Sequence, residues 1–338
     1  MYVSPEDVVA AGKRIAAYTH RTPILESHLL NSWFGGHRIH FKIECHQRVG
    51  AFKARGAIHA LLALKERGVK PEHVVAFSSG NHAQAVAWAG RELGIPTTIY
   101  LPEFVSSVKK QATRSYGAKV VETKTRMQAE EMVADAVKTG ATLIPPYDSD
   151  DVIAGQGTAA LEAFEDADVA FDAAFAPIGG GGLVSGTWLA AQAITPATQV
   201  FGAEPLNAND AARSLRDGKI FRWPDSPDTI ADGARTLAVS ERTFHFIKKL
   251  GGIFEVTEEA MMYWTQWLTH LLKVNVEPTS AMGMAAAQQW IANLPAGTSK
   301  KNILVIISGG NLAPSSYKKI WDKDFLIATP APVIPALR

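Results

Sequence analysis

The chain has 338 residues, 47% of them hydrophobic and 20% charged, which is typical of a globular protein with about two domains. Lysine plus arginine (34) nearly equals aspartate plus glutamate (33), which excludes a net field that favours nucleic acid or a membrane surface and leaves a small molecule as the expected partner. A single cysteine, Cys45, excludes an intramolecular disulfide, and no signal peptide or apolar run of about 18 residues is present, so we predict a cytoplasmic protein.

The predicted elements begin with a helix. Ser4 is a suitable N-cap, Pro5 suits the first helical position, and apolar residues at helical spacing extend the helix to about Tyr18. After it, short apolar runs predict strands at residues 40–43, 73–77, 97–101, 119–122, 172–176, 199–203, 253–256 and 302–307. Amphipathic stretches between the runs predict helices, among them residues 56–67, 82–93 and 280–292.

Strands that alternate with helices predict an α/β fold, in which a mainly parallel sheet is covered by helices on both faces. In such folds, ligands bind beyond the carboxyl ends of the strands. Three polar or glycine-rich clusters come directly after predicted strands, at residues 78–82, 179–182 and 308–311. We therefore expect one site assembled from distant segments. Residues 328–338 form a proline-rich tail that we expect to join no core.

Four consecutive glycines, Gly179 to Gly182, lie between a predicted strand and a helical pattern. Glycines at this position allow backbone N–H groups to converge on an anion at a helix start, so we predict a phosphate-binding loop over a merely flexible turn. The dinucleotide pattern G-x-G-x-x-G fails because Ser185 takes its last position, and the P-loop pattern fails because Thr187 stands where lysine is required.

The segment from Ser78 to His82, SSGNH, also precedes a predicted helix. Its hydroxyl and N–H groups at a helix start suit a carboxylate. An ordinary N-cap formed by Ser79 or Asn81 explains the segment equally well.

Lys53 lies at the start of another predicted helix, in the sequence GAFKARGA. The helix dipole opposes a positive charge in the first turn, so this lysine is a candidate for a lowered pKa and Schiff-base chemistry. A solvated surface lysine is the common alternative.

Several segments resemble the fold-type II pyridoxal-phosphate (PLP) enzymes, the tryptophan synthase β-like fold, and within it the threonine dehydratase and serine racemase family. They are HQRVGAFKARGA, SSGNHAQAVAWAGRELGIP, VIAGQGTAALE, APIGGGGLVSG, TIADGA, VEPTSAMG and IISGGN, in the family's order. The resemblance implies two open, twisted, mainly parallel sheets with helices on both faces. It also implies a large PLP-binding domain at 1–65 and 149–325, a small domain at 66–148, a C-terminal tail at 326–338, and a homodimer.

The resemblance implies a role for each matching residue. Lys53 would bind PLP covalently and act as general base, and Phe52 would pack beside the ring. The other cofactor contacts would come from Asn81 on the 3-hydroxyl, Gly179, Gly180, Gly181 and Gly182 on the phosphate, and Ser308 on the pyridine nitrogen. A serine there leaves the nitrogen largely unprotonated, which suits rapid expulsion of a β-substituent. Ser79 would return a proton on the opposite face in a racemase. The substrate carboxylate would be held by Ser78, Ser79, Asn81 and His82.

Glu204, Ala208 and Asp210 resemble the divalent-cation site of serine racemases. Two carboxylates and the Ala208 carbonyl, completed by water, suit a hard ion, so we expect Mg²⁺, with Ca²⁺ or Mn²⁺ as alternatives. Two surface acids near a turn are the other interpretation.

The implied activity is β-elimination from L-threonine, L-serine or 3-hydroxyaspartate, which gives a 2-oxo acid and ammonia. The residues before Phe52 read VGA where the common dehydratase motif has TGS, and this form, together with IPPYD at 144–148, resembles microbial serine racemases and 3-hydroxyaspartate dehydratases. Serine racemase with side dehydratase activity is therefore the alternative within the family. A non-catalytic PLP or amino-acid binding protein, the alternative from another class, predicts loss of Lys53 or Ser308, and both are present.

Overall fold

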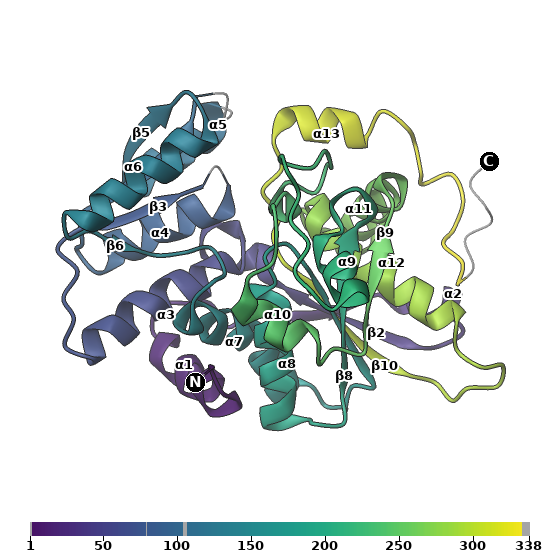
Figure 1. Ribbon diagram of the computed structural model, residues 1–338. Helices are drawn as coiled ribbons and strands as arrows, with labels where there is room; N and C mark the ends of the chain where they lie inside the picture. Colours follow the sequence, from purple (N-terminus) through teal and green to yellow (C-terminus); the bar gives the residue numbers. More distant parts are fainter. Residues whose placement is uncertain (1, 79, 104–106, 333–338) are drawn as a thin grey trace.

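The computed structural model describes residues 2–78, 80–103 and 107–332, which build two sheets flanked by helices (Figure 1). A six-stranded sheet has the order β1-β2-β10-β7-β8-β9, and a four-stranded sheet has the order β5-β4-β3-β6. Neighbouring strands in both sheets run parallel, except β1 and β2, which are antiparallel. The predicted fold of two mainly parallel sheets is confirmed.

The large sheet contains β1 (Ile24–Glu26), β2 (Arg38–Ile43), β7 (Ala173–Pro177), β8 (Gln199–Pro205), β9 (Gly252–Val256) and β10 (Asn302–Ile307). The small sheet contains β3 (Val74–Phe77), β4 (Thr97–Pro102), β5 (Lys119–Thr123) and β6 (Thr142–Leu143). Each predicted strand is present within about two residues of its expected bounds. The sequence did not predict β1 and β6, because three and two residues are too few to show a periodicity.

The helices are α1 (Pro5–Ile15), α2 (His28–Trp33), α3 (Lys53–Glu66), α4 (Asn81–Glu92), α5 (Ser107–Ser115), α6 (Arg126–Lys138), α7 (Asp150–Asp166), α8 (Gly182–Ile194), α9 (Asp210–Asp217), α10 (Glu241–Ile247), α11 (Glu258–Leu272), α12 (Pro278–Ala292) and α13 (Pro314–Ile320). Among the described residues, no helix has the length and apolar character needed to cross a membrane. Ser4 caps α1 as predicted, by accepting a hydrogen bond from the Asp7 amide. However, α1 ends at Ile15 and not near Tyr18, because the Tyr18 and Thr19 amides both turn back to the Ile15 carbonyl.

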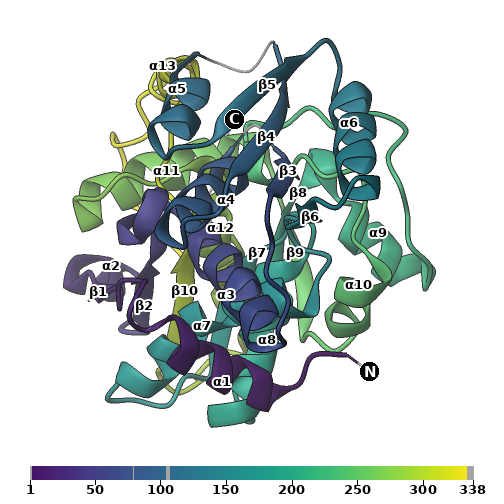
Figure 2. The ribbon, with the colours of Figure 1, turned by 90° about the vertical axis from the view of Figure 1, so that its left-hand side faces the viewer.

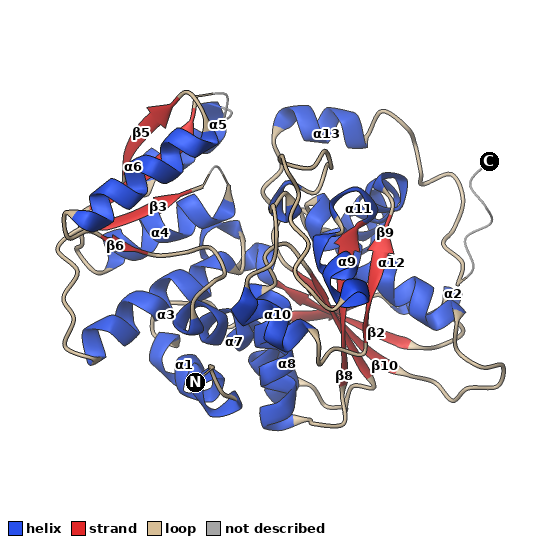
Figure 3. Cartoon of the chain, in the orientation of Figure 1, coloured by secondary structure: helices blue, strands red, loops and turns tan. Residues whose placement is uncertain are grey.

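Helices cover both faces of the large sheet, as the colouring by secondary structure makes visible (Figure 3). Along β10, Ile303, Val305 and Ile307 pack into a core with α11 and α12, whereas Leu304 and Ile306 pack into a core with α1, α7 and α8. Burial on both faces explains why this strand reads as a continuous apolar run.

Helix α3 lies between α4 and α7, which can be followed in the view turned by 90° (Figure 2). Its residues Ala54, Ala57, Ile58 and Leu61 join the core of the small sheet, while the same helix packs against α7 beside the large sheet. Helix α3, which begins at Lys53, therefore packs against elements of both sheets. The division into domains at residues 65 and 149 stays a prediction.

The end of the chain differs from the prediction that it joins no core. In its described part, residues 328–332, Pro330 is buried, and the Ala331 carbonyl accepts a hydrogen bond of 2.6 Å from Gln288 Nε2. Proline-rich composition hides these contacts, because they use one apolar side chain and backbone atoms.

Candidate active site

Lys53 begins α3 at the end of a loop that other segments hold in place. The Phe52 amide donates to the Ser308 carbonyl, and the Gly310 amide donates to the Gly50 carbonyl, both at 3.0 Å. Val49, in the same loop, has φ +58, a strained conformation for a β-branched residue. The segment that follows β10 thus fixes the loop that carries Lys53.

The Lys53 amine has an unusual environment. Its side chain is half-buried, and Nζ donates a hydrogen bond of 2.6 Å to the Pro146 carbonyl. No carboxylate of the described residues forms an ion pair with it. Desolvation of the amine lowers the pKa of Lys53 to about 8, although the charge of Glu277 acts in the opposite direction. The alternative of an ordinary solvated lysine does not fit these contacts.

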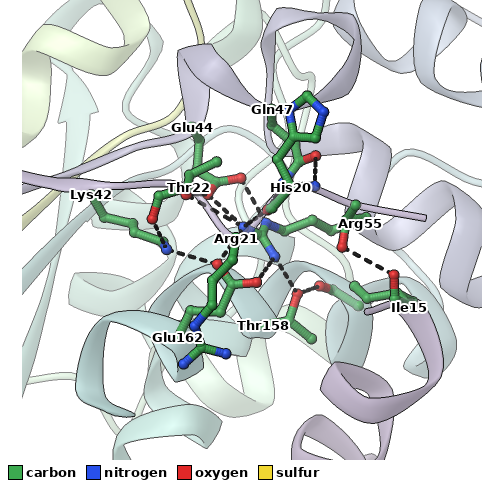
Figure 4. A network of polar contacts seen from close by, with 12 residues as sticks. Ile15, His20, Arg21, Thr22, Lys42, Glu44, Gln47, Arg55, Thr158 and Glu162 are labelled. Carbon is green, nitrogen blue, oxygen red and sulfur yellow. Dashed lines mark hydrogen bonds and ion pairs between the residues drawn. The ribbon is translucent and has the colours of Figure 1, made fainter. Parts of the chain in front are cut away.

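Two residues further along α3, Arg55 differs from Lys53 because carboxylates surround its charge (Figure 4). Its guanidinium is 0% exposed and donates to both oxygens of Glu44 and both oxygens of Glu162, at 2.7 to 2.8 Å. Lys42 Nζ joins the same cluster by donating to Glu162 Oε2 and to the Thr22 carbonyl, each at 2.7 Å. Burial alone would lower the pKa of Arg55, but the two carboxylates raise it. This cluster is a fully paired, structural ion network.

The start of α4 is the second part of the site. Gly80 is the N-cap residue and offers no side-chain cap, so the interpretation in which Asn81 caps this helix is wrong. Asn81 Nδ2 instead donates to both carboxylate oxygens of Glu277 at 3.1 Å, and its Oδ1 accepts from Asn311 Nδ2 at 2.8 Å. Ser78 Oγ accepts from the Gly80 amide at 3.3 Å. The N–H groups of the first turn of α4 remain available for an anion. Ser79 lies outside the described residues.

His82 has one hydrogen-bonded ring nitrogen. Nε2 lies 2.8 Å from the Ile144 carbonyl and therefore carries the proton, while Nδ1 is buried without a partner among the described residues. Burial and the nearby charge of Lys53 lower the pKa of His82 to about 3, so the ring is neutral. The side chain therefore has no donor left for a substrate carboxylate, which leaves the backbone amide of His82 for that contact.

The glycine loop at Gly179–Gly182 has no room for side chains. A Cβ on Gly179 would lie 2.5 Å from the Gly233 carbonyl oxygen, and one on Gly180 would lie 2.1 Å from the Tyr147 ring. Gly181 has φ +88 and caps α8 without any side-chain hydrogen bond. A crowded loop of free amides at the start of a helix is chemically suited to a phosphate.

Ser308 follows β10 and is buried, with its Oγ 2.9 Å from Ser280 Oγ. Glu277, which the sequence interpretation did not assign to the site, lies beside the next residue, because its amide donates to the Gly309 carbonyl at 3.1 Å. Burial, together with the charge of Asp232, raises the pKa of Glu277 to about 7. Lys109 of α5 forms an ion pair with Asp232, which connects a helix beside the small sheet to a loop of the large sheet's part of the chain. The motif VEPTSAMG contained the signal for Glu277, since it places an acid directly before a helix.

Glu204 and Asp210 are brought together, and both are buried rather than on the surface. The Glu204 carboxylate accepts from the Ala211 and Ala212 amides at 2.9 Å. The Asp210 oxygens have no partner with good hydrogen-bond geometry among the described residues, although the Val239 amide is close enough to moderate the Asp210 pKa. Burial raises the pKa of both acids, and their mutual repulsion raises that of Glu204 further. This buried, uncompensated pair is chemically suited to a cation, and Ala208, also buried, lies between the two in sequence. No cluster of three or more His, Cys, Asp or Glu side chains suited to a metal occurs in the described part of the chain.

Comparison with known proteins agrees with this geometry. The family model described as "pyridoxal-phosphate dependent enzyme" matches residues 15–309. L-threo-3-hydroxyaspartate ammonia-lyase of Saccharomyces cerevisiae is 41% identical over 92% of this chain and 94% of its own length. Serine racemase of Schizosaccharomyces pombe is 41% identical over 92% of this chain and 95% of its own. The crystal structure of a threonine deaminase from T.th. is 44% identical, covers 92% of this chain and 99% of that one, and superposes with a TM-score of 0.84. The chain therefore belongs to the fold-type II pyridoxal-phosphate-dependent enzymes, in the family of threonine dehydratases and serine racemases.

Proposed function

We propose that this enzyme removes water and then ammonia from a small β-hydroxy amino acid (L-threonine, L-serine or 3-hydroxyaspartate) to give a 2-oxo acid. The observation that carries this proposal is the Lys53 amine, which lacks a carboxylate partner among the described residues and has a pKa lowered to about 8. Bound PLP would supply the electron sink that stabilises negative charge at the substrate Cα. The similarity to an ammonia-lyase and a deaminase supports elimination over other PLP chemistries.

The residues present fit that cofactor. The amides of the glycine loop would hold its phosphate, Ser308 would face its pyridine nitrogen, and Lys53 would carry it covalently. Phe52, whose ring centroid lies 5.1 Å from Lys53 Nζ, would pack beside it. Asn81 would reach the 3-hydroxyl only by sharing the amide that now bonds to Glu277 and Asn311.

Two groups would handle the substrate. The first-turn amides of α4, including those of Asn81 and His82, would bind its carboxylate, and Ser78 would add its hydroxyl. The Lys53 amine would take the Cα proton, because a lysine with a pKa near 8 has a usable neutral fraction at physiological pH. The Pro146 carbonyl would orient that amine.

Serine racemase with side dehydratase activity is the second candidate, favoured by the 41% identity to a serine racemase. Racemisation needs a proton donor on the face opposite Lys53, and we assign this role to Ser79. We also propose that Glu204, Asp210 and the Ala208 carbonyl bind Mg²⁺, with Ca²⁺ and Mn²⁺ as competitors, because the two acids are buried without a cation. A homodimer and a cytoplasmic location stay proposals from the sequence.

A substrate panel tests the activity. The purified enzyme is incubated with L-serine, L-threonine and the 3-hydroxyaspartates, and both 2-oxo acid and D-enantiomer are measured. We expect 2-oxo acid from at least one substrate, a loss of several orders of magnitude in Lys53→Ala, and little change in the matched control Lys65→Ala, whose side chain is exposed on the same helix. Borohydride reduction should fix the cofactor on Lys53. Formation of the D-enantiomer without 2-oxo acid would instead favour the racemase. If neither product forms with any substrate, both candidate functions are refuted.

A further inference from the structure

The segment Ile144–Tyr147, which leaves β6, contacts three separate parts of the site. The Ile144 carbonyl accepts from His82 Nε2 at 2.8 Å, and the Pro146 carbonyl accepts from Lys53 Nζ at 2.6 Å. Tyr147 then lies against the glycine loop. The segment supplies no side chain that the proposed chemistry uses, yet it connects the carboxylate-binding helix, the reactive lysine and the phosphate loop.

The contact between Tyr147 and Gly180 is unusually close. A Cβ built on Gly180 would lie 2.1, 2.2 and 2.3 Å from ring carbons Cδ1, Cγ and Cε1 of Tyr147, and these are its three nearest atoms. A Cβ on Gly182 would lie 3.1 Å from Tyr147 Cβ. The aromatic ring therefore occupies the space that a side chain at Gly180 would need, directly against the loop backbone.

The Tyr147 ring is anchored through its hydroxyl group, and helix α10 lies against the next glycine of the loop. Tyr147 Oη donates a hydrogen bond of 3.0 Å to the Ala238 carbonyl. From α10, which begins shortly after Ala238, Thr243 lies against Gly181, where a Cβ would be 2.9 Å from Thr243 Cβ. The glycine loop is thus enclosed between the Tyr147 ring and α10. Four glycines in a row have a large conformational freedom when nothing restrains them.

We infer that Tyr147 is a positioning residue, whose ring fixes the backbone of the glycine loop in its phosphate-binding conformation. The inference rests on the proposed function, because it takes the loop to be the site of the cofactor phosphate. A loop that is already ordered binds its ligand without the entropy loss of ordering at that moment. Tyr147 therefore governs retention of the cofactor, while Pro146, its neighbour, orients the amine that attaches it.

Release of PLP from the holoenzyme tests this inference. The protein is dialysed or diluted, free PLP is measured over time, and the dissociation constant is obtained by fluorescence titration. We expect Tyr147→Phe, which keeps the ring and loses the bond to Ala238, to weaken PLP binding about twofold to threefold. Tyr147→Leu and Tyr147→Ala should weaken it tenfold or more. The control is Tyr317→Ala on α13, whose side chain is 52% exposed and far along the chain from the loop.

The pair Tyr147 and Gly180 allows a sharper test. Gly180→Ala should weaken PLP binding strongly in the wild-type background, because its Cβ meets the ring. In the Tyr147→Ala background the ring is gone, so the same change should be neutral or should tighten binding by restraining the loop. The ³¹P resonance of the bound cofactor should broaden in Tyr147→Ala and sharpen again in the double variant.

Two results would overturn the inference: PLP binding in Tyr147→Leu and Tyr147→Ala within twofold of wild type, or an equal effect of Gly180→Ala in both backgrounds. Thermal unfolding of the cofactor-free proteins identifies a variant that fails to fold. If Tyr147→Ala fails to fold, PLP binding by Tyr147→Leu decides the outcome. Lyase activity takes no part in these measurements. Failure of the inference is therefore distinct from failure of the proposed function, which the substrate panel detects.

Discussion

Lys53 and Arg55 lie in the first turn of α3, two residues apart, and the protein treats their charges in opposite ways. Arg55 is 0% exposed and receives two carboxylates, Glu44 and Glu162, as ion-pair partners. Lys53 receives a single neutral acceptor, the Pro146 carbonyl. The first arrangement keeps a charge permanently and serves structure. The second lowers a pKa and leaves an amine that can give up its proton.

Glu204 and Asp210 are the acidic counterpart of Lys53, because they too are ionisable groups without a partner of opposite charge among the described residues. They are buried acids as Glu44 is, yet the described residues provide no cation beside them. Burial lowers the pKa of Lys53 and raises the pKa of this pair for the same reason: the charged form is desolvated. An uncompensated buried charge is therefore the feature that separates the proposed functional groups from the network of Figure 4.

The largest effect is expected for Arg55→Met. Removal of the guanidinium takes the ion-pair partner away from the buried Glu44 and leaves the part-buried Glu162 paired with Lys42, so the free energy of unfolding should fall by about 3–5 kcal/mol. Urea unfolding followed by circular dichroism measures this change.

The matched control is Arg21→Met. Arg21 pairs with Glu165 and Asp166, but its side chain is 53% exposed, so its removal should lower the free energy of unfolding by less than about 1 kcal/mol. Equal losses in the two variants would show that burial of the Arg55 network has no special importance for stability.

The second prediction concerns Lys53→Met in the cofactor-free protein. The pKa of Lys53 is about 8 in the folded chain and 10.5 for the unperturbed group, so the unfolded chain binds more protons between these pH values. Wild-type stability relative to the variant should therefore rise as pH increases from about 8 to about 10.5, with a slope of at most about 1.4 kcal/mol per pH unit. Partial exposure of the side chain reduces that slope.

Below pH 8 both the folded and the unfolded chain carry the proton, so the difference levels off there, and the wild type is least stable relative to the variant because its folded state carries a desolvated charge that the methionine lacks. Urea unfolding at a series of pH values gives the difference between the two proteins, in which groups common to both cancel. A difference that is flat across this range would mean that the Lys53 amine is as solvated as an ordinary surface lysine.

The third prediction tests the acids without a cation. Saturating Mg²⁺ should raise the melting temperature, and at about 100 times its dissociation constant it would add about 2.7 kcal/mol to stability. The double variant Glu204→Gln, Asp210→Asn should lose this response while PLP stays bound. Asp228→Asn, at a fully exposed acid, is the control and should respond as wild type does. If the double variant also responds as wild type does, the ion binds elsewhere.

The sequence predicted those parts of the molecule that have a local pattern. The strand Asn302–Ile307 was predicted with its observed bounds, because both faces are buried and every residue from Ile303 on is apolar. It also indicated the glycine loop, since four glycines between a strand and a helix have few other uses. Strands β1 and β6 were missed because they are held by pairing with neighbours and have no periodicity of their own.

The missing parts of the site depend on contacts between distant residues. Tyr147 acquires its place only because Gly180 meets it in the folded chain, and the Pro146 carbonyl is a backbone atom that no side-chain pattern marks. His82 was expected to help hold the carboxylate, but the sequence could not show that the Ile144 carbonyl takes the single N–H of its side chain and leaves only the backbone amide for this contact. Glu277 was visible as a residue, although its burial was not.

The position of β10 has a consequence for how the enzyme is made. This strand lies between β2 and β7, and the residues after it hold the Lys53 loop through the Phe52 and Gly310 amides. On the ribosome, Lys53 is therefore synthesised long before the segment that positions it. The nascent chain can pair β7 with β8 early. The edge of β2 that pairs with β10 stays unpaired until residues 302–307 emerge. We expect cofactor attachment to be one of the last events of biosynthesis, after most of the chain has been translated.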